Sequence, residues 1–155
     1  MNIVMNASPL IFLDKIGRLE LLNELFEGIY IPKAVIQEID TIKNQSEKVK
    51  LAKILYNEFE VLNKTAVAGL LGKLHLGEVE VIVGAIEQNI AVVVLDDNVA
   101  RIKAKQIGLE VTGTLGILLR AKAKGYIDDI STDLDKLKEA GMYLSDHIIR
   151  QVLTS

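Results

Sequence analysis

The chain has 155 residues, of which 50% are hydrophobic and 5% aromatic, so it is long enough for one domain with a largely aliphatic core. It contains no cysteine, which excludes disulfides, thiolate metal sites and cysteine nucleophiles, and leaves oxygen atoms as the ligands for any metal. Its net charge of −3 shows none of the strong basicity of many nucleic-acid-binding proteins. It does not exclude a nucleic-acid substrate, because an acidic metal site contributes negative charge that bound cations would neutralise.

The first 40 residues predict two strands that alternate with three helices. In chain order these are a strand at residues 2–6, helices at 9–16 and 19–26, a strand at 29–31 and a helix at 32–39. Ser8 is the expected N-cap of the first helix and Pro9 its first residue, where the missing N–H of proline is harmless. Gly28 is expected to end the second helix. Asn6 thus lies on the turn that leaves the first strand, and Glu38 at the margin of the apolar face of the third helix.

The rest of the chain continues the alternation after a polar segment, residues 40–48, that we expect to be a mobile loop. In chain order we expect a helix at 49–59, a weak strand at 60–63, helices at 66–74 and 76–87, a strand at 92–95, a helix at 99–107, a strand at 109–113 and helices at 115–124, 132–140 and 145–153. The predicted fold class is therefore α/β, a three-layer α/β/α sandwich with a central parallel sheet, formed by a single domain over residues 1–155. Because no stretch resembles a signal peptide or approaches the length of a membrane span, we expect a soluble, cytoplasmic protein without a membrane partner.

The segment at residues 92–97, Val-Val-Val-Leu-Asp-Asp, is the most informative one. An apolar run followed by two acids is typical of a buried strand that delivers carboxylates to its carboxyl end. Ligands bind at that edge in α/β sheets, and Asn6 is expected to reach the same edge from the first strand. Glu38 and Glu78, in early turns of their helices, are expected to border it. Asn6, Glu38, Glu78 and Asp96 together predict a site whose oxygen ligands suit Mg²⁺ or Mn²⁺. Such a site fits metal-assisted phosphodiester hydrolysis.

Five ordered sequence blocks resemble one known family. The blocks are residues 4–10 (VMNASPL), 31–39 (IPKAVIQEI), 76–80 (LGEVE), 95–101 (LDDNVAR) and 111–116 (VTGTLG). Their combination resembles the PIN-domain-like proteins over nearly the whole chain, and more narrowly the DUF3368 branch of predicted prokaryotic nucleic-acid-binding proteins. The resemblance implies a PIN-like fold and a metal-dependent endoribonuclease activity, often as the toxin of a toxin–antitoxin pair. It also implies RNA as the substrate, an antitoxin protein as a partner and, in many members, a homodimer.

The resemblance assigns the four acidic positions of the family residue by residue. The candidate catalytic residues, from the first position to the fourth, are Asn6, Glu38, Glu78 and Asp96. The three acids among them are the candidate ligands of Mg²⁺ or Mn²⁺, with Asp97 as a further metal ligand because the alignment can slip by one residue. The residues alone also allow a structural interpretation, in which Glu38 and Glu78 complement helix dipoles and Asp96 with Asp97 caps the next helix.

Four further residues are candidate substrate contacts. They are Ser8, Thr112, Thr114 and Arg101. Similar PIN proteins place a hydroxyl near the metal, so Ser8 fits that role as well as the role of a helix cap. Thr112 and Thr114 flank a turn glycine and are either turn residues or substrate contacts. Arg101 forms an i, i+4 pair with Lys105 that is either a solvated helix face or a pair of phosphate contacts.

Asn6 departs from the family pattern, in which an aspartate usually stands at this position. An amide still offers a carbonyl oxygen, but it removes one negative charge where a cation must be held. The alternative function is therefore a catalytically degenerate PIN module that binds RNA or a protein partner without cleaving. A phosphoacceptor domain of the receiver type is less favoured, because the opening strand ends in one asparagine instead of an acidic pair. The aliphatic residues of the last helix belong either to the core or to a dimer interface, and they are Ile148, Ile149, Val152 and Leu153.

Overall fold

The computed structural model describes residues 1–42, 44 and 48–155. Its strands are β1 (Asn2–Met5), β2 (Gly28–Pro32), β3 (Asn57–Phe59), β4 (Val92–Val94) and β5 (Glu110–Thr112). Its helices are α1 (Ala7–Lys15), α2 (Leu21–Leu25), α3 (Lys33–Asp40), α4 (Lys64–Leu70), α5 (Leu76–Glu87), α6 (Asn98–Ile107), α7 (Thr114–Ala123), α8 (Ser131–Glu139) and α9 (Asp146–Leu153), with a 3₁₀ turn, η1 (Leu51–Lys53). The mobile loop expected at residues 40–48 falls partly on residues 43 and 45–47, which lie outside the described residues.

The strand β1 lies at the centre of the sheet. Over the described residues the strand order is β3-β2-β1-β4-β5, and every neighbouring pair is parallel. Met5 pairs with Val94, so β1 and β4 end at the same level. The three valines of β4 are buried, as expected for a strand that has helices on both faces. The predicted α/β fold with a parallel sheet is confirmed, and its carboxyl edge brings Asn6 next to the residues that follow β4.

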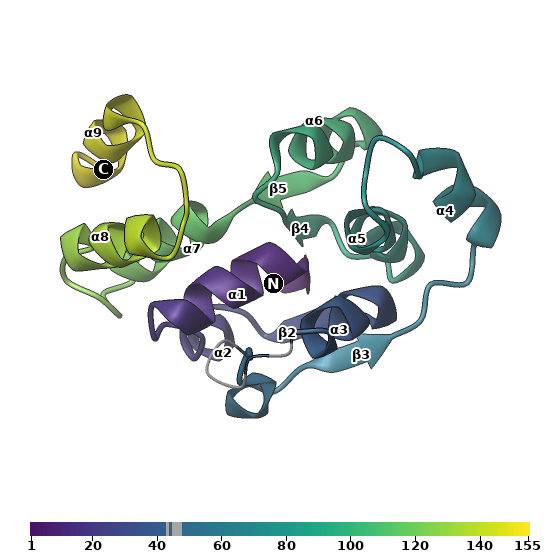
Figure 1. Ribbon diagram of the computed structural model, residues 1–155, viewed down its shortest axis with the longest axis horizontal. Helices are drawn as coiled ribbons and strands as arrows, with labels where there is room; N and C mark the ends of the chain where they lie inside the picture. Colours follow the sequence, from purple (N-terminus) through teal and green to yellow (C-terminus); the bar gives the residue numbers. More distant parts are fainter. Residues whose placement is uncertain (43, 45–47) are drawn as a thin grey trace.

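Helices cover both faces of the sheet and make three layers (Figure 1). On one face α5 contacts β1, β2 and β4 and packs against α4 and α6. On the other face α7 contacts α1 and α2, while α8 contacts α1. Buried hydrophobic side chains from these layers form a core cluster that extends to Val152 in α9. None of the described helices is long and apolar enough to cross a membrane.

The first helix begins earlier than the sequence suggested. The prediction of Ser8 as its N-cap is wrong, because α1 begins at Ala7 and Asn6 holds the N-cap position without a side-chain hydrogen bond to the helix. The backbone of Asn6 is still extended (φ −87°, ψ 168°), whereas Ser8 is already helical and its hydroxyl donates to Asp96. Gly28 likewise does not end the second helix, because it is the first residue of β2.

The segment before α4 differs from the helix predicted at residues 49–59 and the strand predicted at 60–63. A 3₁₀ turn, η1, forms instead, and the edge strand β3 pairs with β2 a few residues before the predicted strand. Val49 and Ile54 are buried whereas Leu55 is 82% exposed, so the apolar residues pack singly and do not share a helical face. Pairing with the open edge of β2 therefore outweighs the helical spacing of this segment.

Candidate functional site

Asn6 lies where β1 ends, and its side chain points into the protein. Its backbone N–H donates to the carbonyl of Val94 (3.1 Å), which fixes the residue beside the end of β4. The residue is 6% exposed, and its Oδ1 is buried without a hydrogen-bond partner among the described residues. A buried polar atom left unpaired costs about 1–3 kcal/mol, and native proteins keep few of them. This oxygen therefore marks a position where a ligand with positive charge would stabilise the protein.

The first turn of α5 has a glycine at the point where Asn6 and Glu38 approach it. A Cβ atom at Gly77 would lie 3.2 Å from Oε1 of Glu38 and 3.4 Å from Oδ1 of Asn6. The two oxygens therefore flank the same point on α5, and the missing side chain of Gly77 leaves room between them. The structure thus brings together the residues assigned to the first and second acidic positions.

Glu78 supplies a second carboxylate next to this point. It is 7% exposed, and its Oε1 accepts a hydrogen bond from the backbone N–H of His75 (3.0 Å), so it caps the N-terminus of α5, where the structural interpretation expected it to complement the helix dipole. Its charge also acts on Glu38, because burial and then the neighbouring Glu78 raise the pKa of Glu38, while His75 lowers it. Two acids and an amide oxygen therefore share one region, and a cation there would relieve the repulsion between the acids.

Replacing Glu38 with glutamine tests this repulsion. The pKa of Glu38 in the folded protein is above the ordinary value of 4.5. Without a cation, this residue therefore lowers the stability of the protein as the pH rises from 4.5 through the raised pKa, and it causes no such loss below pH 4.5. In a chelating buffer at pH 7 we expect Glu38→Gln to raise Tm by at most about 2 °C, since solvent screens this residue. At a pH of about 4 the difference should vanish, because the carboxyl is then largely protonated in both states.

Added Mn²⁺ should stabilise the wild type and not the variant, and thermal melts at both pH values check this. A variant that is less stable than the wild type at pH 7 without cation would contradict the repulsion.

Asp96 follows β4 and is held by donors from two helices. Its Oδ1 accepts from the Thr114 N–H (2.8 Å), and its Oδ2 accepts from the hydroxyls of Thr114 (2.7 Å) and Ser8 (3.5 Å). Thr114 is fully buried at the start of α7, which fixes this orientation. Gly113 makes room for the carboxylate, since a Cβ atom there would lie 2.7 Å from Oδ1 of Asp96. The structure therefore groups Ser8, Thr114 and Asp96, and the two hydroxyls orient the acid.

Asp97 faces the helix that follows it. Its side chain accepts from the backbone N–H of Ala100 (3.0 Å) as the N-cap of α6, and the residue is exposed. Asp96 and not Asp97 is hydrogen-bonded to Ser8 and Thr114. The arrangement therefore favours Asp96 for the fourth acidic position and the capping interpretation for Asp97.

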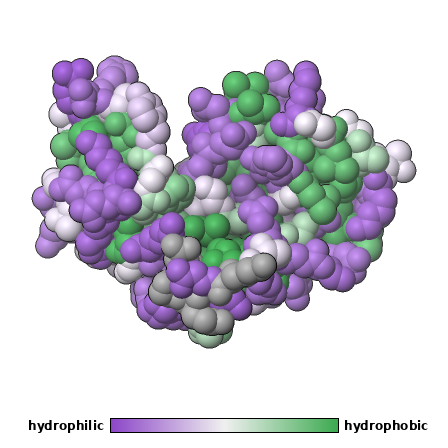
Figure 2. All heavy atoms as spheres, in the orientation of Figure 1, coloured by the Kyte–Doolittle hydropathy of each residue, from purple (hydrophilic) through white to green (hydrophobic). Residues whose placement is uncertain are grey.

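A cleft of 790 Å³ runs from Asp96 to the C-terminal part of the chain. Arg101 and Thr112 line it on one side and residues 141–144 on the other. Figure 2 shows the surface hollowed between α6 and the end of the chain that carries α9. Nη1 of Arg101 donates to the carbonyl of Leu95 (2.8 Å), which holds the guanidinium at the cleft. The predicted substrate contacts Arg101 and Thr112 thus lie in a concave surface large enough for a ligand.

The donor set fits a hard divalent cation. Carboxylate and amide oxygens are the ligands that Mg²⁺ and Mn²⁺ prefer, and the unpaired Oδ1 of Asn6 beside Gly77 offers one of them. Within residues 1–42, 44 and 48–155, no three Asp, Glu, His or Cys side chains converge as a ready-made metal cluster. The candidate site is therefore the pair Glu38 and Glu78 with the amide of Asn6, while Asp96 is held at the same sheet edge by its own hydrogen bonds.

Two other buried carboxylates were not anticipated from the sequence. Glu80 is 7% exposed and accepts from the backbone N–H of Ala34 (3.1 Å), which ties α5 to the start of α3. Asp133 is 2% exposed and accepts from Nε (2.9 Å) and Nη2 (3.3 Å) of Arg18, which ties α8 to the turn after α1. Both acids join their own helix to another segment of the chain, and no local sequence pattern distinguishes them from acids on a solvated helix face.

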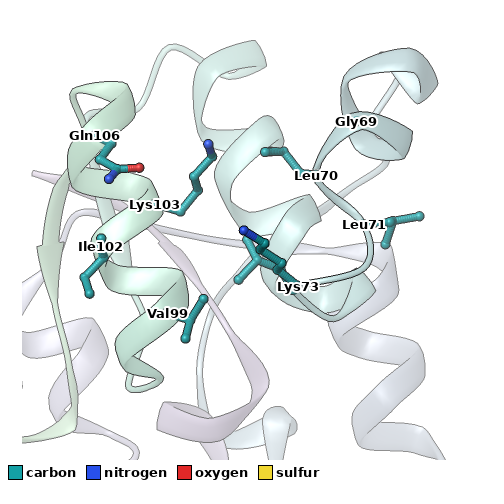
Figure 3. A pocket seen from close by; sticks show the side chains of 9 residues that line it. Gly69, Leu70, Leu71, Lys73, Val99, Ile102, Lys103 and Gln106 are labelled. Atoms are coloured by element: carbon teal, nitrogen blue, oxygen red, sulfur yellow. The ribbon is translucent and has the colours of Figure 1, made fainter.

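A second cavity, of 440 Å³, lies away from the candidate site. Figure 3 shows it between α6 and the segment that ends α4 and leads into α5. The residues around it are Gly69, Leu70, Leu71, Lys73, Leu74, Val99, Ile102, Lys103 and Gln106. None of the predicted site residues lines this cavity.

The fold and the site together define a class of protein: an α/β sandwich that presents acids and an amide at the carboxyl ends of its central parallel strands. A family model described as DUF3368, PIN domain, matches residues 2–155, and the chain belongs to this family. Among solved structures, the chain is similar to a PilT N-terminus domain protein from the hyperthermophilic archaeon Sulfolobus solfataricus P2. The two share 16% identity with a TM-score of 0.54, over 95% of this chain and 99% of that one. This likeness concerns the fold, and the predicted PIN-like fold is confirmed. The comparison with curated proteins gives no match.

Proposed function

We propose that this chain is a Mg²⁺- or Mn²⁺-dependent endoribonuclease of the PIN type. The observation that carries the proposal is the buried Oδ1 of Asn6, which has no partner among the described residues and shares the start of α5 with Glu38 and Glu78. Membership of the PIN family supports a phosphodiester as the bond that is attacked. The cleft that extends from Asp96 past Arg101 supports a polymeric substrate.

The residues at the sheet edge would have different roles in binding the cation. Asn6, Glu38 and Glu78 would hold the cation, and Asp96 would complete the set of oxygen ligands in the orientation that Ser8 and Thr114 give it. A bound Mg²⁺ or Mn²⁺ orients a water molecule, lowers its pKa and stabilises negative charge on phosphate oxygens. Because Glu38 must be ionised to bind a cation, its raised pKa predicts weaker binding in acidic solution.

A second candidate function is a PIN module that binds RNA or a protein partner without cleaving it. Two observations favour it. Asn6 stands where a charged ligand is usual in the family, and no three acidic side chains converge in the described part of the chain. In that case the cation would be held too weakly for chemistry, while the cleft and Arg101 would still bind a partner.

Incubation of the wild type with a mixed RNA pool separates these functions. With Mg²⁺ or Mn²⁺ we expect RNA fragments, and with EDTA we expect none. RNA that is bound but not cut, under either cation, would support the non-cleaving module. Cleavage that persists in EDTA would contradict a metal-dependent mechanism.

We extend the proposal to a biological role as the toxin of a toxin–antitoxin pair in the cytoplasm, with a protein antitoxin as partner. The support is the resemblance of the five sequence blocks to PIN proteins. A homodimer would use the C-terminal helix, in which Leu153 is 42% exposed whereas Val152 is 6% exposed. Light scattering over a series of protein concentrations tests the dimer, and a monomer at every concentration would contradict it.

A further inference from the structure

The part of the cleft wall formed by residues 141–144 carries an exposed aromatic side chain. Tyr143 is 86% exposed, and it lines the same 790 Å³ cleft as Asp96 and Arg101. A ring that is this exposed contributes little to the packing of the fold, because it removes little apolar surface from water. Its position in the cleft wall therefore suggests a role in binding.

The backbone on both sides of Tyr143 is anchored. The helix α8 is followed by Gly141 in the left-handed conformation (φ 102°), which favours glycine. Leu144 is 8% exposed and belongs to the core. The hydroxyl of Ser145 accepts a backbone N–H in the first turn of α9 (3.1 Å). A fixed segment therefore presents the tyrosine ring, which lowers the entropy lost when a ligand binds to it.

Arg101 supplies a phosphate donor in the same cleft. Its Nη1 is committed to the carbonyl of Leu95 (2.8 Å), and its other nitrogens have no hydrogen-bond partner among the described residues. A guanidinium that is held in place and still has donors to offer is well suited to the oxygens of a phosphate. The cleft thus presents a donor for a nucleic-acid backbone and a ring for a base.

We propose that Tyr143 is a base-stacking residue, on whose ring an unpaired RNA base stacks while Arg101 holds a neighbouring phosphate. This inference rests on the proposed ribonuclease function and names a residue that positions the substrate of that site. Stacking on an aromatic ring tolerates any sequence, because every base has a π-face. A protein segment is the competing occupant, since Val111 and Leu115 give the cleft apolar lining. Nucleic acid is favoured because the cleft combines a phosphate donor, Arg101, with Asp96, one of the acids of the proposed cleavage site.

The test is the affinity of matched variants for a labelled oligouridine, measured by fluorescence anisotropy in Ca²⁺ so that the strand stays intact. Tyr143→Ala should weaken binding about 5- to 150-fold, whereas Tyr143→Phe should stay within about twofold of the wild type. Tyr126→Ala is the control, because Tyr126 is 47% exposed and does not line the cleft, and it should bind as the wild type does. On an abasic strand of equal length, the wild type and Tyr143→Ala should bind equally.

Two binding results would overturn the proposal. Equal affinity of the wild type and Tyr143→Ala for oligouridine would remove the stacking role and leave the apolar cleft to a protein partner. An equal loss on oligouridine and on the abasic strand would mean that Tyr143 contacts the backbone and not a base.

The RNA-pool assay with Mn²⁺ separates failure of the stacking proposal from failure of the proposed ribonuclease function. A wild type that cleaves while Tyr143→Ala binds normally refutes the stacking residue alone, and a wild type that neither binds nor cleaves refutes both proposals.

Discussion

The Asn6→Asp variant is expected to bind Mn²⁺ at least about tenfold more tightly than the wild type and to cleave RNA faster. The substitution keeps the size of a side chain that is 6% exposed and replaces an unpaired amide by a charged ligand. In a partly buried site, one more negative charge next to a divalent cation attracts it by several kcal/mol, of which desolvation removes a large part. Mn²⁺ titration calorimetry and RNA cleavage rates measure the two effects.

The same substitution should cost stability when no cation is present. The new carboxylate at position 6 would be buried beside Glu38 and Glu78, where like charges repel. We expect a loss of about 1–3 kcal/mol, which corresponds to a Tm lower by roughly 2–12 °C in EDTA. Saturating Mn²⁺ should remove this deficit. An Asn6→Asp protein whose Tm and RNA cleavage are both indifferent to Mn²⁺ would show that Asn6 does not face a cation site.

The Asp96→Asn variant is expected to lose RNA cleavage by at least about 100-fold while it stays folded. The amide removes a charge from the sheet edge, but it preserves the shape that fits beside Gly113. The Thr114 hydroxyl, which donates to Oδ2 in the wild type, can rotate to accept a hydrogen bond from the new NH₂ group. Circular dichroism melts should therefore show a loss of no more than about 1 kcal/mol, so that lost activity is not lost folding.

Asp97→Asn is the matched control for this experiment. It removes the same charge one residue further along the chain, and asparagine serves as an N-cap of α6 about as well as aspartate does. We expect nearly unchanged stability and RNA cleavage within a few-fold of the wild type. If Asp97→Asn lost cleavage and Asp96→Asn kept it, the fourth acidic position would belong to Asp97.

Much of the fold follows from local sequence signals. The apolar run at residues 92–95 followed by two acids indicated the buried strand and its carboxyl edge, and the predicted range 76–87 coincides with α5. The prediction for the segment after α3 was wrong, because β3 is an edge strand of only three residues. The pairing of β3 with β2 leaves no trace in the local periodicity of the sequence. Hydrogen bonds between distant parts of the chain determine the structure of that segment. The spacing of Val49 and Ile54 reflects separate contacts of each residue with the core.

The candidate site was predictable in its residue types but not in its internal geometry. That Asn6 and Asp96 follow parallel strands whose carboxyl ends share one edge was predicted from the alternation of elements, whereas the direct pairing of β1 with β4 is visible only in the structure. The sequence gives no sign that Thr114 and Ser8 hydrogen-bond Asp96, since these contacts join positions far apart in the chain. Nor does it distinguish Tyr143 from the other tyrosines, because its exposure depends on how the segment between α8 and α9 is anchored.

The most direct test of the account is anomalous scattering from crystals of the wild type soaked in Mn²⁺. The site predicts an anomalous peak at the carboxyl edge of the sheet, within ligand distance of Oδ1 of Asn6 and of the Glu38 and Glu78 carboxylates. The peak should be stronger in Asn6→Asp crystals and absent from Glu38→Gln crystals soaked in the same way. Mn²⁺ found at other acids, with Oδ1 of Asn6 still unpaired, would contradict the metal site and with it the proposed mechanism.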